Sequence, residues 1–135
     1  MAERETFEHP ITVETHHLDD LNHVNNVVYL QWVQDVAAAH WNHRATPEMK
    51  DQYIWVVLDH FLEYKKPALL GEKLTARTYV ENYNGPKSER HVHILRGDVL
   101  LVQAKTTWCL LDKSSMRPRR VPQEFADIFA PTAEG

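Results

Sequence analysis

The chain has 135 residues, of which 43% are apolar and 25% are charged. One domain is the default for this length, and the composition is that of a globular protein rather than a disordered one. The net charge of −4 argues against bulk electrostatic binding to nucleic acid or to anionic membranes. A single cysteine cannot form an internal disulfide, and neither a signal peptide nor an apolar run of about 20 residues is visible. We therefore expect one domain over residues 1–135, cytoplasmic, without membrane or nucleic-acid partners.

The first predicted element is a strand over residues 11–17, where apolar and polar side chains alternate. A loop rich in Asp and Asn follows it. Residues 26–43 contain no Gly or Pro and carry apolar side chains around almost the whole circumference, which predicts a helix buried on most sides. Asn25 or Asn26 is the expected N-cap of this helix, and Pro47 lies just past its end.

The rest of the chain predicts strands, because β-branched and aromatic residues or a clean alternation dominate each segment. These segments are residues 53–64, 73–83, 90–96 and 99–111. The dipeptide Gly97-Asp98 is a hairpin signal, and Asn84-Gly85-Pro86 marks another turn. A short amphipathic helix is predicted over residues 122–129.

The predicted order is β-α-β-β-β-β, with one long apolar helix and a mostly antiparallel sheet of about five strands. The economical way to bury the helix is a sheet that curls around it. Such a sheet leaves one face or edge in need of a partner. A dimer is the natural way to cover it, either by strands that continue across chains or by faces that meet.

The densest cluster of polar groups precedes the predicted helix, in the segment Asp19-Asp20-Leu21-Asn22-His23-Val24-Asn25-Asn26. A buried helix N-terminus presents unpaired N–H groups and a partial positive charge, which favour an anion or a developing oxyanion. A carboxylate slightly upstream can act across the same cavity as base or nucleophile. These are the groups that acyl transfer to water needs. The competing interpretation is that the Asp and Asn side chains are caps and that the histidine bonds to a loop carbonyl.

The stretch from Asp19 to Leu30, DDLNHVNNVVYL, resembles the signature of the 4-hydroxybenzoyl-CoA thioesterase family of hotdog-fold proteins. That signature is Asp, two variable residues, a position that is usually Gly, then His-Val-Asn-Asn, two variable residues and Tyr. The element order and an Arg-Pro-Arg stretch before a Pro-started helix also fit, so the resemblance covers nearly the whole chain. It implies an α+β hotdog fold, with a curved antiparallel five-stranded sheet wrapped around a long central helix.

The resemblance implies a role for several residues of this motif. Asp19 would be the catalytic carboxylate, acting as nucleophile or general base, and the backbone N–H near Asn26 would polarise the thioester carbonyl. His23 and Asn25 would orient the loop or the substrate. Asn22 stands where most bacterial members have Gly, and Asn tolerates the left-handed backbone that Gly allows.

Plant acyl-carrier-protein thioesterases have a similar stretch with an Asn two residues after the Asp. Here that position is Leu21, so their Asp-Asn-His arrangement is not reproduced, and Asp20 is expected at the surface. The residues expected at the substrate are Asn22, Asn25, Val27, Tyr29, Arg119 and Arg120.

Other polar residues admit a binding role as well as a bland one. The pairs His40/His43 and His91/His93 have spacings that could hold zinc, but no Cys ligand or His-Glu-x-x-His motif accompanies them, so we expect no metal. Glu63 is expected as a surface charge at a strand end. Arginine and lysine suit the phosphates of coenzyme A, although a basic run in a tail is usually solvated. The cationic candidates are Lys65, Lys66, Lys87, Arg90, Arg117, Arg119 and Arg120.

The sequence thus predicts an acyl-CoA thioesterase that hydrolyses a thioester to a free carboxylic acid and CoA, as a homodimer or homotetramer. No cofactor is expected, because a thioester is already an activated carbonyl and coenzyme A is part of the substrate. One alternative is a thioesterase for acyl-carrier protein. Another is a hotdog module without catalytic activity, which would bind acyl-CoA but release no thiol. The Trp and Tyr side chains are expected in the core or at an interface, and Cys109 as a small buried hydrophobe.

Overall fold

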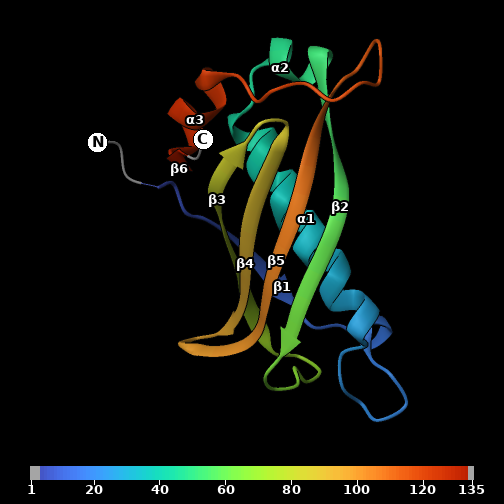
Figure 1. Cartoon of the computed structure of the whole chain (residues 1–135). Coiled ribbons are helices and arrows are strands. Elements are labelled where there is room, and N and C mark those ends of the chain that lie inside the picture. Colours follow the sequence, from blue (N-terminus) through green and yellow to red (C-terminus); the bar gives the residue numbers. More distant parts are fainter. Residues whose placement is uncertain (1–3, 134–135) are drawn as a thin grey trace.

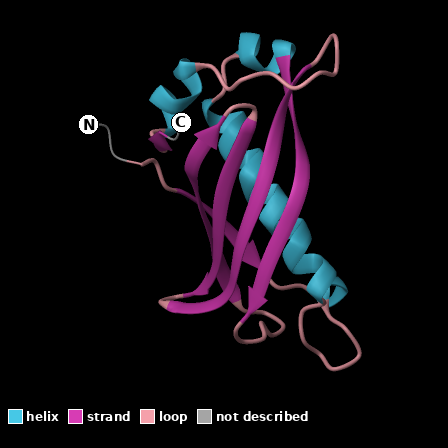
Figure 2. Cartoon of the chain, in the orientation of Figure 1, coloured by secondary structure: helices cyan, strands magenta, loops and turns pink. Residues whose placement is uncertain are grey.

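The computed structural model describes residues 4–133. One long helix lies against a curved antiparallel sheet (Figure 1). Figure 2 shows that the short helices gather at one end of the sheet, whereas the loop that leads into the long helix lies at the other end. The helices are α1 (Asn26–Arg44), α2 (Pro47–Gln52) and α3 (Gln123–Phe129), with a 3-10 turn at Thr15–His17. The strands are β1 (Phe7–Thr12), β2 (Tyr53–Tyr64), β3 (Lys73–Asn84), β4 (Lys87–Arg96), β5 (Val99–Asp112) and β6 (Thr132–Ala133).

The sheet order is β1-β3-β4-β5-β2, and every neighbouring pair in this path is antiparallel. The short strand β6 pairs in parallel with β3. Because β1 and β2 are the ends of the path, they are the two edges of the sheet. No helix of the described chain has both the length and the apolar character needed to cross a membrane.

The main core lies between α1 and the concave face of the sheet. Alternate residues of each strand point toward the helix, as the twofold period of a strand requires. Each large apolar side chain in this layer contributes about 1.5–3 kcal/mol by leaving water. The buried members of this core include Tyr29, Val33 and Val36 of α1 and Leu74, Ala76, Val92, Ile94, Val102 and Ala104 of the sheet.

Most of the expected architecture is confirmed. The predicted helix extends one residue further than expected, and the strand expected over residues 53–64 has those bounds. Gly97 adopts a left-handed φ of 60° between β4 and β5, as the hairpin signal requires. Cys109 is buried, as predicted.

The first strand is a correction. It was expected over residues 11–17 but runs from Phe7 to Thr12, and Thr15–His17 forms a 3-10 turn instead. Pro10 therefore lies inside the strand, opposite Thr75 of β3. A proline has no N–H to donate, and β1 tolerates it because an edge strand pairs on one side only.

Helix α2 was not predicted, although its start carries a clear signal. The Thr46 hydroxyl accepts a hydrogen bond from the Met49 N–H at 3.1 Å, so Thr46 is the N-cap. Pro47 occupies the first turn, where its missing N–H costs nothing. This proline was interpreted only as the end of the preceding helix, whereas it also begins the next one.

Helix α1 is buried on most sides, as expected, but one stripe is open in the single chain and includes apolar side chains. Val27 is 72% exposed, and Gln31, Asp35 and Ala38 are exposed as well. These positions recur every three or four residues, so they form one stripe along the helix. The sheet covers only the opposite face.

A chain of buried polar groups joins α1 to the strands. His40 has no exposed surface, and its Nε2 lies 2.7 Å from the Glu5 carboxylate. Arg90 Nη1 donates to His40 Nδ1 at 2.9 Å and to the Thr78 hydroxyl at 3.1 Å. Since Nδ1 must accept, the His40 ring is neutral and donates from Nε2 to Glu5. Burial, and then the charge of Arg90, lower the pKa of His40 to about 4.

This shift predicts how stability depends on pH. Unfolded histidine titrates near pH 6.5, so between pH 6.5 and 4 the unfolded chain binds a proton that His40 in the folded chain does not. Stability should therefore fall as the pH falls through this window. The variant His40→Gln should be less stable at pH 7 but should lose less stability on acidification, as measured by urea unfolding at a series of pH values.

The exposed His43 on the same helix supplies the control. His43→Gln should keep the acid dependence of the parent protein, which includes contributions of the same sign from His17, His60 and His93. An acid dependence in His40→Gln as steep as in the parent would contradict a neutral buried His40.

Candidate active site

The loop before α1 is shaped by the carboxylate of Asp19. Its Oδ1 accepts hydrogen bonds from the N–H of Leu21 at 2.8 Å and of His23 at 3.2 Å. The Asp19 N–H donates to the His23 carbonyl at 2.8 Å, which closes the loop on itself. Asn22 has a left-handed φ of 60°, as expected for a residue at the usual Gly position. Asp19 Oδ2 has no hydrogen bond among the described residues and remains available.

The helix begins directly after this loop. Asn25 is the N-cap, and its side-chain oxygen accepts from the Val27 N–H at 3.1 Å. The Val28 N–H donates to the Asn25 carbonyl at 2.9 Å. In the described part of the chain no hydrogen bond engages the N–H of Asn26. One backbone donor at the positive end of the helix dipole is therefore free.

The loop after β2, residues 65–72, packs against this motif and is called the supporting loop. The Val24 N–H donates to the Ala68 carbonyl at 3.2 Å, and His23 forms a bridge with Leu69. The Ala68 N–H donates to the Tyr29 hydroxyl at 2.9 Å. Backbone hydrogen bonds and the Tyr29 hydroxyl thus connect the motif, the helix and this loop.

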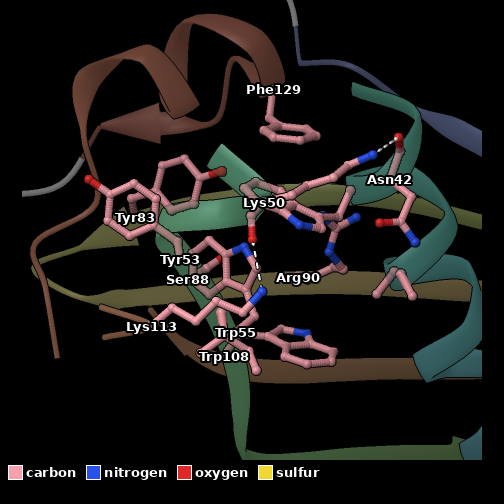
Figure 3. A pocket seen from close by; sticks show the side chains of 14 residues that line it. Asn42, Lys50, Tyr53, Trp55, Tyr83, Ser88, Arg90, Trp108, Lys113 and Phe129 are labelled. Atoms are coloured by element: carbon pink, nitrogen blue, oxygen red, sulfur yellow. Dashed lines mark hydrogen bonds between the residues drawn. The ribbon is translucent and has the colours of Figure 1, made fainter. Parts of the chain in front are cut away.

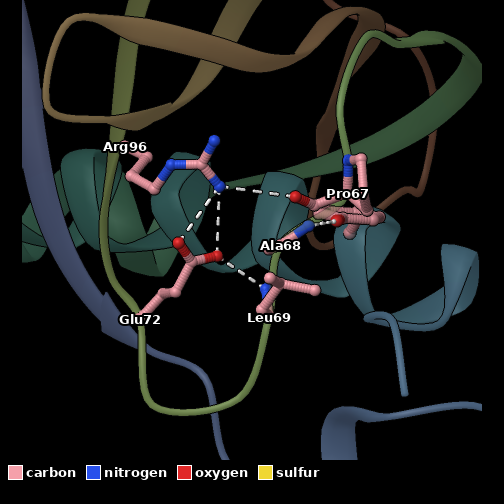
Figure 4. A network of polar contacts seen from close by, with 6 residues as sticks. Pro67, Ala68, Leu69, Glu72 and Arg96 are labelled. Atoms are coloured by element: carbon pink, nitrogen blue, oxygen red, sulfur yellow. Dashed lines mark hydrogen bonds and ion pairs between the residues drawn. The ribbon is translucent and has the colours of Figure 1, made fainter.

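Two charged side chains hold the supporting loop in shape (Figure 4). Arg96 donates from Nη1 to both oxygens of Glu72 at 3.1 Å, and its distance to the Pro67 carbonyl is 3.5 Å. Glu72 Oε1 accepts from the Leu69 N–H at 2.6 Å. No sequence motif indicates this network, because its members come from the loop and from β4.

Tyr29 was expected at the substrate, but the structure places it in the core. Only 3% of its surface is exposed, and its hydroxyl already accepts from the Ala68 N–H. Burial raises the pKa of Tyr29, so the phenol stays protonated. The motif tyrosine thus positions the supporting loop and does not face solvent.

The surface around the motif is apolar and open. Asp19 and His23 are half-buried, whereas Asp20 is exposed as expected. Leu21 is 74% exposed, close in the chain to the carboxylate. Further exposed apolar side chains belong to the helix start, to β2 from its midpoint to its end, and to the supporting loop; they are Val27, Leu58, Phe61, Tyr64, Leu69 and Leu70. In a single chain the supporting loop packs against one side of the motif, and the other side is open to solvent.

The structure does not bring the tail arginines to Asp19 within one chain. Arg119 binds Asp112 at 2.9 Å, and Asp112 pairs with Tyr53 at the start of β2. The loop that supports Asp19 follows the other end of β2. Since β2 has 12 residues, the two ends are roughly 36–40 Å apart.

The structure places Arg90 away from the expected CoA site and Glu63 at the surface, as expected. Arg90 was a candidate for the CoA phosphates, but it is buried beside His40 and cannot meet a ligand on the outer surface. Glu63 is exposed and lies 3.5 Å from Lys65, as expected for a surface charge.

The histidine pairs considered for zinc do not converge on a metal position. Both ring nitrogens of His40 are already engaged, and His91 pairs with Glu89 at 3.0 Å. Among the described residues, three possible ligands converge at Glu14, His16 and His17, with ligand atoms within 4.8 Å of one another. His17 Nδ1 there accepts the Glu14 N–H.

Comparison with known proteins agrees with this architecture. Residues 4–129 match the family model for the acyl-ACP thioesterase N-terminal domain. The "Putative acyl-CoA thioesterase YneP" of Bacillus subtilis (strain 168) is 26% identical over 115 residues, which covers 84% of this chain and 83% of YneP. The "Long-chain acyl-CoA thioesterase FadM" of Escherichia coli (strain K12) is 31% identical over 83 residues, covering 56% of this chain and 58% of FadM. SAV2348 of Staphylococcus aureus, solved in complex with CoA, superposes with a TM-score of 0.82 at 19% identity, over 96% of this chain and 85% of that one.

A curved antiparallel sheet around one long helix is the hotdog fold of the similar solved structures, and the named relatives put the protein in the thioesterase class. The match over residues 4–129 places the chain in the acyl-ACP thioesterase N-terminal domain family, to which it belongs. The fold and the thioesterase class expected from the sequence are confirmed.

The hydrogen bond from Ala68 to Tyr29 yields a test of the support beneath the motif. Tyr29→Phe leaves a buried N–H without an acceptor, which should cost about 1–3 kcal/mol in the free energy of unfolding. Urea unfolding measures this loss, and hydrogen exchange of the Ala68 amide should become faster. Tyr64→Phe, at an exposed tyrosine whose ring lies 5.7 Å from that of Tyr29, should change neither quantity. Parent-like stability and exchange in Tyr29→Phe would contradict the role of this bond.

Proposed function

We propose that this protein hydrolyses an acyl-CoA thioester to a free carboxylic acid and CoA, with Asp19 as the catalytic carboxylate. The observation that carries the proposal is the state of Asp19: one oxygen fixes the loop through two N–H groups, and the other is free to react. The free N–H of Asn26 lies at the first residue of the adjacent helix α1. YneP and FadM, which are named acyl-CoA thioesterases, and the CoA complex of SAV2348 support CoA as the carrier.

The reaction needs an activated attacking group and a donor for the oxyanion. In one route Oδ2 of Asp19 removes a proton from water, which attacks the carbonyl carbon. In the other route Oδ2 attacks the carbon directly and water then hydrolyses the resulting anhydride. In both, the Asn26 N–H and the helix dipole stabilise the oxyanion, and the CoA thiolate leaves and takes up a proton. The thioester is already activated, so no cofactor enters.

Within the thioesterase class, we assign the chain to the 4-hydroxybenzoyl-CoA thioesterase group, because the segment from Asp19 to Tyr29 follows that signature except at Asn22. The left-handed backbone of Asn22 reproduces what Gly does at that position. The family model is named for acyl-ACP thioesterases, so hydrolysis of a carrier-bound acyl chain is the second candidate. The Asn that plant members carry two residues after the Asp is Leu21 here, which favours CoA.

We further propose that the active unit is a dimer formed through β2; a tetramer would consist of two such dimers. β2 is a 12-residue edge strand with unpaired backbone groups, and Phe61 is 61% exposed on it. Such an edge is a template for a second chain. Antiparallel pairing with a second copy would bring the Tyr53 end of one protomer to the Tyr64 end of its partner. Arg119 and Arg120 would then approach the partner's thioester site, where CoA phosphates need cations.

Asp19→Asn tests the proposed chemistry. The amide oxygen of Asn still accepts the two loop hydrogen bonds, so folding should persist, but turnover should fall by roughly 10²–10⁴ because the base or nucleophile is lost. Thiol release from a panel of acyl-CoAs and from acyl-carrier protein measures the rate and identifies the carrier. Asp20→Asn, at the exposed neighbouring carboxylate, should retain full turnover. Near-normal turnover in Asp19→Asn would remove this residue from the mechanism.

Phe61→Asp tests the dimer. A charge within the proposed β2 interface should be desolvated on pairing and should shift the protein to monomers, which sedimentation velocity detects. Thioester turnover should fall with the dimer, since the site would lose its second wall. Thr12→Asp places the same charge at an exposed position on β1, the opposite edge of the sheet, and should leave the assembly unchanged. A Phe61→Asp protein that remains dimeric would refute pairing through β2.

A further inference from the structure

A cavity of about 360 Å³ lies between the C-terminal half of α1 and the sheet, at the end that carries α2 and α3 (Figure 3). We call it the aromatic cavity, after the rings that line it, which belong to Trp41, Tyr53, Trp55, Tyr83, Trp108 and Phe129. In the β2 dimer proposed above, the Tyr53 end of one protomer lies beside the partner's thioester site. The aromatic cavity therefore belongs to that site and is not a separate one.

A different group of polar side chains lies at the opposite end of α1, in the connection from β1 to the helix. Glu14, His16 and His17 each offer one metal-ligand atom, and these three atoms lie within 4.8 Å of one another. We call these residues the Glu-His-His cluster. They form one short 3-10 turn with Glu14 as its N-cap. The turn is bonded to the start of α1, because the His17 carbonyl accepts the Asn25 N–H at 2.9 Å.

The spacing of two of these side chains matches a metal ion that bridges them. His16 Nδ1 lies 3.5 Å from Glu14 Oε2, which is longer than an ordinary hydrogen bond of about 2.7–3.2 Å. Two ligands on one zinc ion, with bonds of about 2.0–2.1 Å at a tetrahedral angle, are roughly 3.4 Å apart. The His16 and Glu14 side chains are 71% and 61% exposed, so an ion can reach them without a rearrangement of the core.

His17 can supply the third ligand. Its Nδ1 accepts the Glu14 N–H at 2.9 Å, so this nitrogen has a lone pair, as a metal ligand requires. A metal ion takes this lone pair or, after exchange of tautomer, that of Nε2. In both cases the Glu14 N–H is released, and because it is exposed it can donate to water instead. The ring of His17 lies edge-on to that of Trp32, with centroids 5.1 Å apart, which limits its rotation.

The charges around the cluster favour a cation. A second cavity, of about 370 Å³, lies between β1 and α1, and its lining includes Glu14 and His17 together with His9 and Asp35. Among the described residues that line it there is no Lys or Arg. The Asp35 carboxylate accepts a hydrogen bond from Gln31 Nε2 at 2.7 Å, which leaves its charge in place. Two carboxylates without a lysine or arginine beside them in the lining attract a positive ion.

We propose that Glu14, His16 and His17 bind one divalent transition-metal ion, of which Zn²⁺ suits the ligand set. Two imidazole nitrogens and one carboxylate oxygen are ligands that Zn²⁺ takes in tetrahedral geometry, whereas Mg²⁺ and Ca²⁺ prefer oxygen ligands throughout. Water completes the coordination, since the cluster faces solvent. The bound ion clamps the turn that holds the N-cap of α1. The proposal does not depend on the thioester chemistry of Asp19.

Isothermal titration of the full chain with Zn²⁺, without a histidine tag, tests the site. One ion should bind per chain in the micromolar range, and excess Mg²⁺ should not displace it. His16→Gln removes an exposed ligand and should weaken binding about tenfold or more. His43→Gln removes an exposed histidine outside the cluster and should bind as the parent does. No saturable binding below millimolar Zn²⁺, or equal affinity of these two variants, would overturn the proposal.

Cu²⁺ then locates the ion, because its unpaired electron broadens nearby NMR signals. Since the His17 and Trp32 rings are in contact, the indole N–H signal of Trp32, assigned with Trp32→Phe, should broaden first. Broadening of the signals from the aromatic cavity instead would refute the assignment. Asp19→Asn should bind Zn²⁺ as the parent does, which separates this site from the hydrolytic one. Loss of Zn²⁺ binding in Asp19→Asn with retention in His16→Gln would assign the ion to the thioesterase loop instead.

Discussion

One long apolar helix must be covered by a single sheet, and the rest of the structure follows from this constraint. The curved sheet covers one face of α1 and leaves a stripe from Val27 to Ala38 exposed. The Asn25 cap fixes where the helix begins, so the backbone donor at Asn26 has a defined position beside the loop of Asp19. The same packing that stabilises the core therefore sets the geometry of the proposed chemistry, and the uncovered stripe explains why a single chain gives only part of a site.

The loop of Asp19 depends on residues that perform no chemistry. Its backbone is held by Ala68 of the supporting loop, which in turn is held by Tyr29, Glu72 and Arg96. In a family motif such as this one, some residues act and others position them. Tyr29 belongs to the second kind, since its hydroxyl faces the supporting loop inside the core. A motif read from the sequence alone does not separate these two roles.

Periodicity and turn residues predicted α1, the four long strands and the hairpin at Gly97, because these signals are local. The backbone of Asn22 was predictable for the same reason. The start of β1 was not, because an edge position decides whether Pro10 can lie within a strand. The burial of Arg90 was not predictable either, since its neighbours His40 and Thr78 are distant in sequence. The aromatic cavity draws on almost every element, and no local pattern contains it.

Pro10 has a consequence for how far copies of the chain can add to one another. The sheet has two edges, and the one formed by β1 carries an imino acid that offers no hydrogen to an incoming strand. The other edge, β2, is long and unblocked. A sheet with one edge that can accept a strand forms a closed dimer. Two such edges would allow chains to add without limit into fibres. The proline thus disfavours the addition of a further strand at β1.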